Sequence, residues 1–266
     1  MKEFEPTKAK PSFYRLAKDK DRPFNWREMY TGDLELFDKV LQNPETVFVY
    51  DIDGILANSP KVVLPRFTAK TGIRTNPAEI NEFGYLTGLA KKAGLPDEIA
   101  DNVEADWYNP EILALAQKYL YMTPVVDKTL SYYGPERNFS LTSRNPKFKE
   151  STPEWFSRKY PKFKKENILM RDDDTIDSLF FKVENLARLS KAAPWVVYLD
   201  DDTRYAKAAI DADIPNCLVI NIPLGRIVPD FRHERLIVIK RYPEYLQAMY
   251  PLLFLVDRAI GNRYNK

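Results

Sequence analysis

Five short apolar runs constrain the fold of this chain more than any other feature of its sequence. They are rich in β-branched residues, and runs of this kind suit strands that are buried on both faces of a parallel sheet. The runs cover residues 47–50, 138–141, 167–170, 195–199 and 217–222. Helix-compatible segments separate the last four, at 153–160, 179–189 and 205–212. Strands that alternate with helices in this way predict βαβ units and a doubly wound, Rossmann-like α/β sheet.

The interval between the first two runs is too long for a simple crossover. A crossover in a parallel sheet needs about a dozen residues, whereas this interval holds several helix-compatible segments, at 78–83, 86–93, 98–107 and 110–121. We therefore expect a helical cap at 60–123, followed by the crossover helix at 124–133. The predicted core comprises 46–59 and 124–225, with an N-terminal extension at 1–45 and a C-terminal helical appendage at 226–266.

Carboxylates follow two of the predicted strands. Asp51, Asp53 and Gly54 come directly after the first strand, and three acids, Asp200, Asp201 and Asp202, follow the fourth. In open α/β sheets, ligands bind at the carboxyl ends of the strands. The sequence therefore predicts that these acids converge on one edge of the sheet.

Hydroxyl and basic side chains are expected at the same edge. The second strand ends in Thr142, Ser143 and Arg144, and Lys182 lies on the helix that leads into the fourth strand. Each of these features also has an ordinary structural explanation, as a turn, a helix cap or a solvated lysine. Three adjacent acids after an apolar strand are electrostatically costly, however, unless a cation or hydrogen-bond donors offset their charge.

The scarcity of histidine and cysteine excludes several kinds of site. The chain has one histidine, His233, and one cysteine, Cys217, so an internal disulfide is impossible, and a Ser-His-Asp triad and a zinc site are disfavoured. Hard oxygen ligands favour Mg²⁺ as the metal. The formal net charge of +2 calls for no nucleic-acid partner. We see neither a signal peptide nor a membrane span, and we expect a cytoplasmic protein without a membrane partner.

The strand-end residues resemble the motifs of the haloacid dehalogenase (HAD) superfamily. Residues 47–56 resemble its first motif, 139–142 its second, Lys182 its third and 196–201 its fourth. The resemblance spans residues 46–222 and implies a core with strand order 5-4-1-2-3 and dependence on Mg²⁺. A second Asp two residues after the first resembles the phosphatase branch of the superfamily rather than the dehalogenases.

The resemblance also implies a role for each site residue. Asp51 would be the nucleophile and Asp53 the general acid and base. Mg²⁺ would be held by Asp51, the backbone carbonyl of Asp53, Asp200 and Asp201. The phosphoryl group would be bound by Gly54, Thr142, Ser143 and Lys182. The chain departs from the family in two places, at Ala212-Asp213, where Ala-Gly often ends the helix, and at Asp202, whose role is open.

Two resemblances compete for the substrate. Residues 51–59 followed by a helical cap resemble the deoxyribonucleotidase-like 5′-nucleotidases, whereas residues 170–175 followed by Lys182 resemble the 3′-phosphatase domain of polynucleotide kinase-phosphatases. Arg144 and Arg171 are candidate substrate contacts in either case. A cap excludes bulky chains, so we expect a small phosphorylated metabolite or nucleotide rather than a nucleic acid. Cap aromatics could stack on a base (Phe83, Tyr85, Trp107 and Tyr108). A catalytically idle binding module of the same fold is a third interpretation.

Overall fold

The computed structural model describes residues 30–80, 84–223, 229–239 and 250–264. Its centre is a seven-stranded sheet with the order β1-β7-β6-β5-β2-β3-β4. Neighbouring strands are parallel except for β1 and β7, which pair antiparallel. The strands are β1 (Tyr30–Thr31), β2 (Val47–Tyr50), β3 (Asn138–Thr142), β4 (Ile168–Met170), β5 (Val196–Asp200), β6 (Cys217–Asn221) and β7 (Leu236–Ile239).

The five predicted strands all form, and a sixth parallel strand joins them. Counted from β2, the parallel strands follow the order 3-2-1-4-5-6 from β4 to β7. Read from the opposite edge, the five predicted strands have the order 5-4-1-2-3. The prediction of a wholly helical C-terminal appendage is wrong at β7, whose Leu-Ile-Val-Ile sequence carries the same apolar, β-branched signal as the other strands. The N-terminal extension likewise contributes the short β1.

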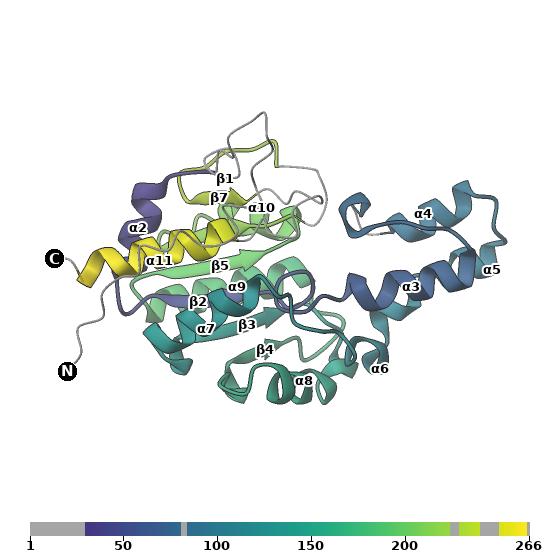
Figure 1. Cartoon of the computed structure of the whole chain (residues 1–266), viewed down its shortest axis with the longest axis horizontal. Coiled ribbons are helices and arrows are strands. Elements are labelled where there is room, and N and C mark those ends of the chain that lie inside the picture. The colour runs from purple at the N-terminus through teal and green to yellow at the C-terminus, as the bar shows by residue number, and fades with distance from the viewer. Residues whose placement is uncertain (1–29, 81–83, 224–228, 240–249, 265–266) are drawn as a thin grey trace, which may run out of the picture.

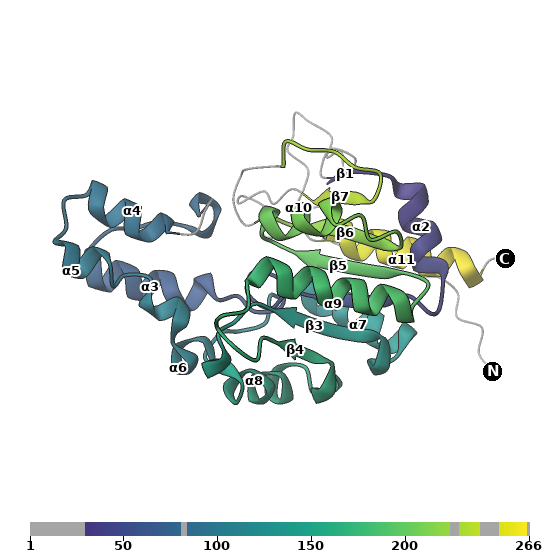
Figure 2. The same ribbon diagram turned by 180° about the vertical axis from the view of Figure 1, so that it is seen from behind.

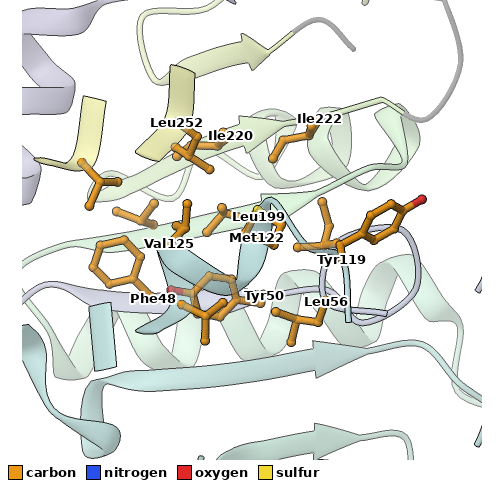
Figure 3. Close-up of a cluster of buried hydrophobic side chains, with 14 of the residues drawn as sticks. Phe48, Tyr50, Leu56, Tyr119, Met122, Val125, Leu199, Ile220, Ile222 and Leu252 are labelled. Atoms are coloured by element: carbon orange, nitrogen blue, oxygen red, sulfur yellow. The ribbon is translucent and has the colours of Figure 1, made fainter. Parts of the chain in front are cut away.

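Alternate residues of the central strands enter two hydrophobic clusters, one on each face of the sheet. Phe48 and Tyr50 of β2 belong to the first cluster, whereas Val47 and Val49 belong to the second. This alternation follows from the two-residue period of a β-strand. Figure 3 shows part of the first cluster, in which Phe48, Leu199 and Ile220 gather around Val125. Helices therefore bury both faces of the central strands.

The helices divide between the two faces. Helices α2, α7 and α11 supply the first cluster, and α9 and α10 supply the second; Figure 1 shows the first group in front of the sheet and Figure 2 the second. The core helices are α2 (Leu34–Gln42), α7 (Met122–Tyr133), α8 (Ser151–Lys159), α9 (Ser178–Ala192), α10 (Thr203–Asp211) and α11 (Tyr250–Tyr264). Short 3₁₀ turns precede β3, α8 and β4 as η4 (Pro135–Arg137), η5 (Pro146–Phe148) and η6 (Lys165–Asn167).

A helical unit between β2 and β3 extends beyond the carboxyl ends of the strands, where the arrowheads of β3 and β5 point toward it (Figure 1). Its elements are α3 (Pro60–Thr71), η2 (Pro77–Glu79), α4 (Tyr85–Lys92), α5 (Asp97–Ala100), η3 (Ala105–Tyr108) and α6 (Pro110–Leu113). They pack around a hydrophobic cluster of their own, which Phe148 of the core also joins. We call this unit the cap.

The cap differs from its prediction in detail. The helix expected at 98–107 is two short elements, α5 and η3, and the helix expected at 110–121 ends at Leu113. Helix α3 was not predicted as a helix, because Pro65 stands inside it and a proline normally interrupts a helix.

Some predicted features lie outside the described residues. These are Phe83, the first part of the N-terminal extension and residues 240–249 of the C-terminal appendage. Within the described part of the chain, we find no helix with the length and apolar character needed to cross a membrane.

Candidate active site

The two predicted acidic motifs meet because β2 and β5 are neighbours. The register pairs Tyr50 with Leu199, and the backbone N–H of Asp51 donates to the carbonyl of Leu199 over 2.9 Å. Asp51 and Asp200, the next residue of each strand, are therefore adjacent at the same edge of the sheet. Both are buried, with 7% and 0% of their surface exposed.

A buried lysine lies between these two carboxylates. Lys182 of α9 donates from Nζ to Asp51 Oδ1 over 2.8 Å and to Asp200 Oδ2 over 2.7 Å, and its side chain is 2% exposed. Burial by itself lowers the pKa of Lys182, but Asp200 and Asp51 more than offset this and raise it. For Asp51, burial is the larger effect and raises its pKa to about 7, although Lys182 acts in the opposite direction.

Three acids are close enough to share a cation. Asp51, Asp200 and Asp201 each offer a carboxylate oxygen, and these oxygens lie within 4.8 Å of one another. Three carboxylates and the Lys182 ammonium leave a net charge of −2 if all are ionised, which a divalent cation would balance. Carboxylate oxygens are also the ligands that Mg²⁺ prefers. The residues therefore fit the predicted metal.

Asp53 is held by a different set of groups. Arg144 donates to both of its carboxylate oxygens, from Nε over 2.7 Å and from Nη2 over 2.8 Å, and Ser59 donates a further hydrogen bond. Thr152 fixes the guanidinium from the other side, 3.1 Å from Nη1. Burial alone would raise the pKa of Asp53, but Arg144 and Ser59 outweigh it and lower that pKa. Asp53 is therefore held in its ionised form.

A cavity of ≈ 310 Å³ opens over these residues. The core contributes most of its wall, and the cap contributes Trp107 and Tyr108. The predicted site residues that line it are Asp51, Asp53, Gly54, Thr142, Ser143, Arg144, Arg171 and Asp201. Lys182 and Asp200 do not line it, because they are buried behind Asp51. A cavity of this size suits a small molecule.

Gly54 has a conformation that a side chain would disturb. Its φ is +83°, and a Cβ placed there would lie 2.2 Å from Asp201 Oδ2. Only glycine lets the loop after β2 approach Asp201 this closely. Its backbone N–H donates to the carbonyl of Ala57 over 3.0 Å, so this donor, which we predicted for a phosphoryl oxygen, also closes the loop.

Arg171 contacts backbone rather than another charged side chain in the described residues. It donates to the carbonyl of Ser143 from Nε and Nη2, over 3.1 and 2.8 Å, and to the carbonyl of Ile176 over 2.8 Å. The arginine therefore ties the loop after β3 to the loop after β4, and its positive charge reaches the cavity wall.

The role that was open for Asp202 is structural in part. Its side chain accepts from the backbone N–H of Arg204 and caps the first turn of α10. It also forms an ion pair with the Arg204 guanidinium. Asp followed by a helical segment is a common capping signal, so this function was accessible from sequence.

Sequence reasoning missed several residues of the site, three of which contact its charged groups or line its cavity as follows. Tyr205 lines the cavity, Ser59 donates to Asp53, and the hydroxyl of Tyr198 donates to Asp200 Oδ2. Ser59 carried a usable signal, because it precedes Pro60 at the start of a helix. Tyr198 and Tyr205 carried none, because an aromatic residue in a strand or helix is usually part of the core.

The fold is similar to solved structures of HAD-type hydrolases. A HAD-like hydrolase from Streptococcus pneumoniae has 13% identity and a TM-score of 0.47, covering 78% of this chain and 99% of its own. A predicted phosphoglycolate phosphatase from Haemophilus somnus has 12% identity and a TM-score of 0.47, covering 70% and 90%. A HAD-superfamily hydrolase from Ehrlichia chaffeensis has 12% identity and a TM-score of 0.46, covering 80% and 97%. No family model and no curated protein matches the sequence.

Proposed function

We propose that this chain is a Mg²⁺-dependent phosphomonoester hydrolase that acts through an aspartyl-phosphate on Asp51. The observation that carries this proposal is the placement of Asp51 at the cavity wall, with Lys182 and two further acids around it. A buried carboxylate with a nearby ammonium and a cation site is equipped to attack an electrophilic phosphorus. The HAD resemblance of the sequence supports the same chemistry.

In the first half of the reaction, an oxygen of Asp51 attacks phosphorus and the bond to the leaving oxygen breaks. Asp53 supplies a proton to that oxygen. In the second half, water attacks the aspartyl-phosphate and passes a proton to Asp53, which releases inorganic phosphate and restores Asp51. The lowered pKa of Asp53 keeps this carboxylate ionised, which leaves it able to accept that proton.

The remaining site residues have supporting roles in this proposal. A bound Mg²⁺, held by Asp51, Asp200, Asp201 and the Asp53 carbonyl, would reduce the repulsion between a carboxylate and a phosphate. Thr142 and Ser143 line the cavity and offer hydroxyl groups to the phosphoryl oxygens. Lys182 keeps Asp51 and Asp200 together and supplies positive charge behind the nucleophile.

The substrate class that we propose is a small phosphorylated metabolite or a nucleotide. The cavity volume and the cap residues Trp107 and Tyr108 at its wall support a small substrate. A polynucleotide 3′-phosphatase is the second candidate, and one observation favours it: Arg171 brings positive charge to the wall without a carboxylate partner among the described residues. Greater turnover of a 3′-phosphorylated oligonucleotide than of mononucleotides would favour this second candidate.

Hydrolysis of p-nitrophenyl phosphate tests the reaction. We expect turnover that requires Mg²⁺ and is lost with a chelator. Asp51→Asn should abolish it, while Asp127→Asn, an exposed aspartate on α7 outside the cavity, should not. Activity of Asp51→Asn equal to that of the control would reject the nucleophile. Absence of metal-dependent turnover in the unmodified chain, across a panel of phosphorylated metabolites, would favour a binding module instead.

A further inference from the structure

Tyr205 of α10 lines the cavity and contacts the buried Lys182. Its ring centroid lies 3.9 Å from Lys182 Nζ, within the range of a cation–π contact. Tyr205 lines the cavity, whereas Lys182 does not. The ring therefore lies against the buried ammonium and also forms part of the cavity wall.

The hydroxyl of Tyr205 fixes the ring at its far edge. It lies 3.1 Å from the hydroxyl of Ser143 and 3.1 Å from that of Ser178. Ser143 follows β3 and lines the cavity, and Ser178 is the first residue of α9, one turn before Lys182. The side chain thus connects three elements around the lysine.

We propose that Tyr205 is a positioning residue that keeps the Lys182 ammonium between Asp51 and Asp200 by covering it with its ring. The inference rests on the function proposed above, and it adds a residue to which nothing in the sequence resemblance assigns a role. Lys182 has a long, flexible side chain, and an uncovered ammonium would gain hydration by turning toward the cavity. A ring over the ammonium offers a weakly attractive surface and excludes water, so the two short bonds to the carboxylates persist.

Two substitutions separate the ring from its hydroxyl. Tyr205→Leu removes the ring, whereas Tyr205→Phe keeps it and loses only the contacts to Ser143 and Ser178. Tyr132→Leu is the matched control, because Tyr132 is also a half-buried helical tyrosine but does not line the cavity. Melting temperatures of all three variants identify any general loss of folding.

The first readout is steady-state hydrolysis of p-nitrophenyl phosphate with Mg²⁺. We expect Tyr205→Leu to lower kcat by about tenfold, a loss between those of an exposed and of a fully desolvated cation–π contact, with KM changed by less than about threefold. Tyr205→Phe and Tyr132→Leu should stay within about threefold of the unmodified chain on the same grounds. A tyrosine that acted only through its hydroxyl contacts to Ser143 and Ser178 would give no such rescue by phenylalanine.

The second readout does not require activity. Acetylation of Lys182 by acetic anhydride, followed by mass spectrometry, reports whether the ammonium is covered. Tyr205→Leu should accelerate this labelling about tenfold, and Tyr205→Phe should not. If Tyr205→Leu labels no faster than the unmodified chain, the inference is overturned. If the unmodified chain has no phosphatase activity but the labelling follows the ring, the proposed function fails while the placement of Tyr205 stands.

Discussion

Replacing Lys182 with methionine tests the charge balance on which the site depends. Methionine has a similar length and no charge, so Lys182→Met leaves Asp51 and Asp200 buried without their shared cation. Breaking a buried ion pair by removing one partner costs about 3–5 kcal/mol. Because the pKa of Asp51 is already raised to about 7, that group can take up a proton at little cost. We therefore expect the lower end, a loss of about 3 kcal/mol at about pH 7.

Urea unfolding with linear extrapolation measures this loss. The deficit should shrink at about pH 5, because protonation of Asp51, whose pKa is raised to about 7, removes one of the uncompensated charges. It should also shrink when Mg²⁺ is added, because a cation bound by the acids replaces the missing one.

Lys191→Met is the control on the same helix. Lys191 is exposed and forms no ion pair within the described residues, so its loss should change the free energy of unfolding by less than about 0.5 kcal/mol. Equal stability of the two variants at about pH 7, with no effect of Mg²⁺ on either, would refute the idea that Lys182 balances buried charge.

Three further predictions concern the loop after β2 and its acids. The folded-state pKa of Asp51 is raised to about 7 from 3.8, so the contribution of Asp51 to stability falls as the pH rises through that interval. The increase in Tm on adding Mg²⁺ should grow over the same interval, because the metal binds the ionised carboxylate. Thermal unfolding at several pH values, with and without Mg²⁺, measures both effects. Gly54→Ala places a Cβ 2.2 Å from Asp201 Oδ2 at a φ of +83°, so we expect at least about tenfold weaker Mg²⁺ activation, measured by metal titration; unchanged activation would mean that the loop relaxes freely. Asp53→Asn should slow hydrolysis of an alkyl phosphate by about 10²-fold or more, and that of p-nitrophenyl phosphate less, because p-nitrophenolate leaves without a proton; equal losses for both substrates would argue against a general acid.

The sheet and its acidic edge were predictable because their signals are local. Each buried parallel strand needs a short apolar run, and the residue that follows it lies at the carboxyl edge. Asp51, Asp200 and Asp201 follow from that rule alone once β2 and β5 are neighbours. The position of Lys182 needed one further step, that α9 packs with its apolar stripe on the sheet and carries the lysine toward the strand ends.

The remaining contacts depend on rotamers and loop conformations that no periodicity specifies. The approach of Tyr205 to Lys182 depends on how α10 packs beside α9. Arg144 was predicted to contact substrate, since a strand-end arginine beside a phosphate site suits that role. In the structure its guanidinium instead pairs with Asp53, which is ninety-one residues away in sequence. Thr152, eight residues away, holds the guanidinium from the other side.

The Arg144–Asp53 pair sets a condition on the proposed mechanism. A general acid must carry a proton when the leaving group departs, and a bidentate guanidinium favours the ionised carboxylate. A phosphoryl group in the cavity is itself a strong partner for a guanidinium, and Arg144 lines that cavity. If the phosphoryl group draws Arg144 away from Asp53, the pKa of Asp53 rises when substrate is bound and falls again after phosphate leaves. The same carboxylate would then donate a proton in the first half of the reaction and act as a base in the second. The predicted substrate contact of Arg144 and its observed pairing with Asp53 would in that case be two positions of one side chain.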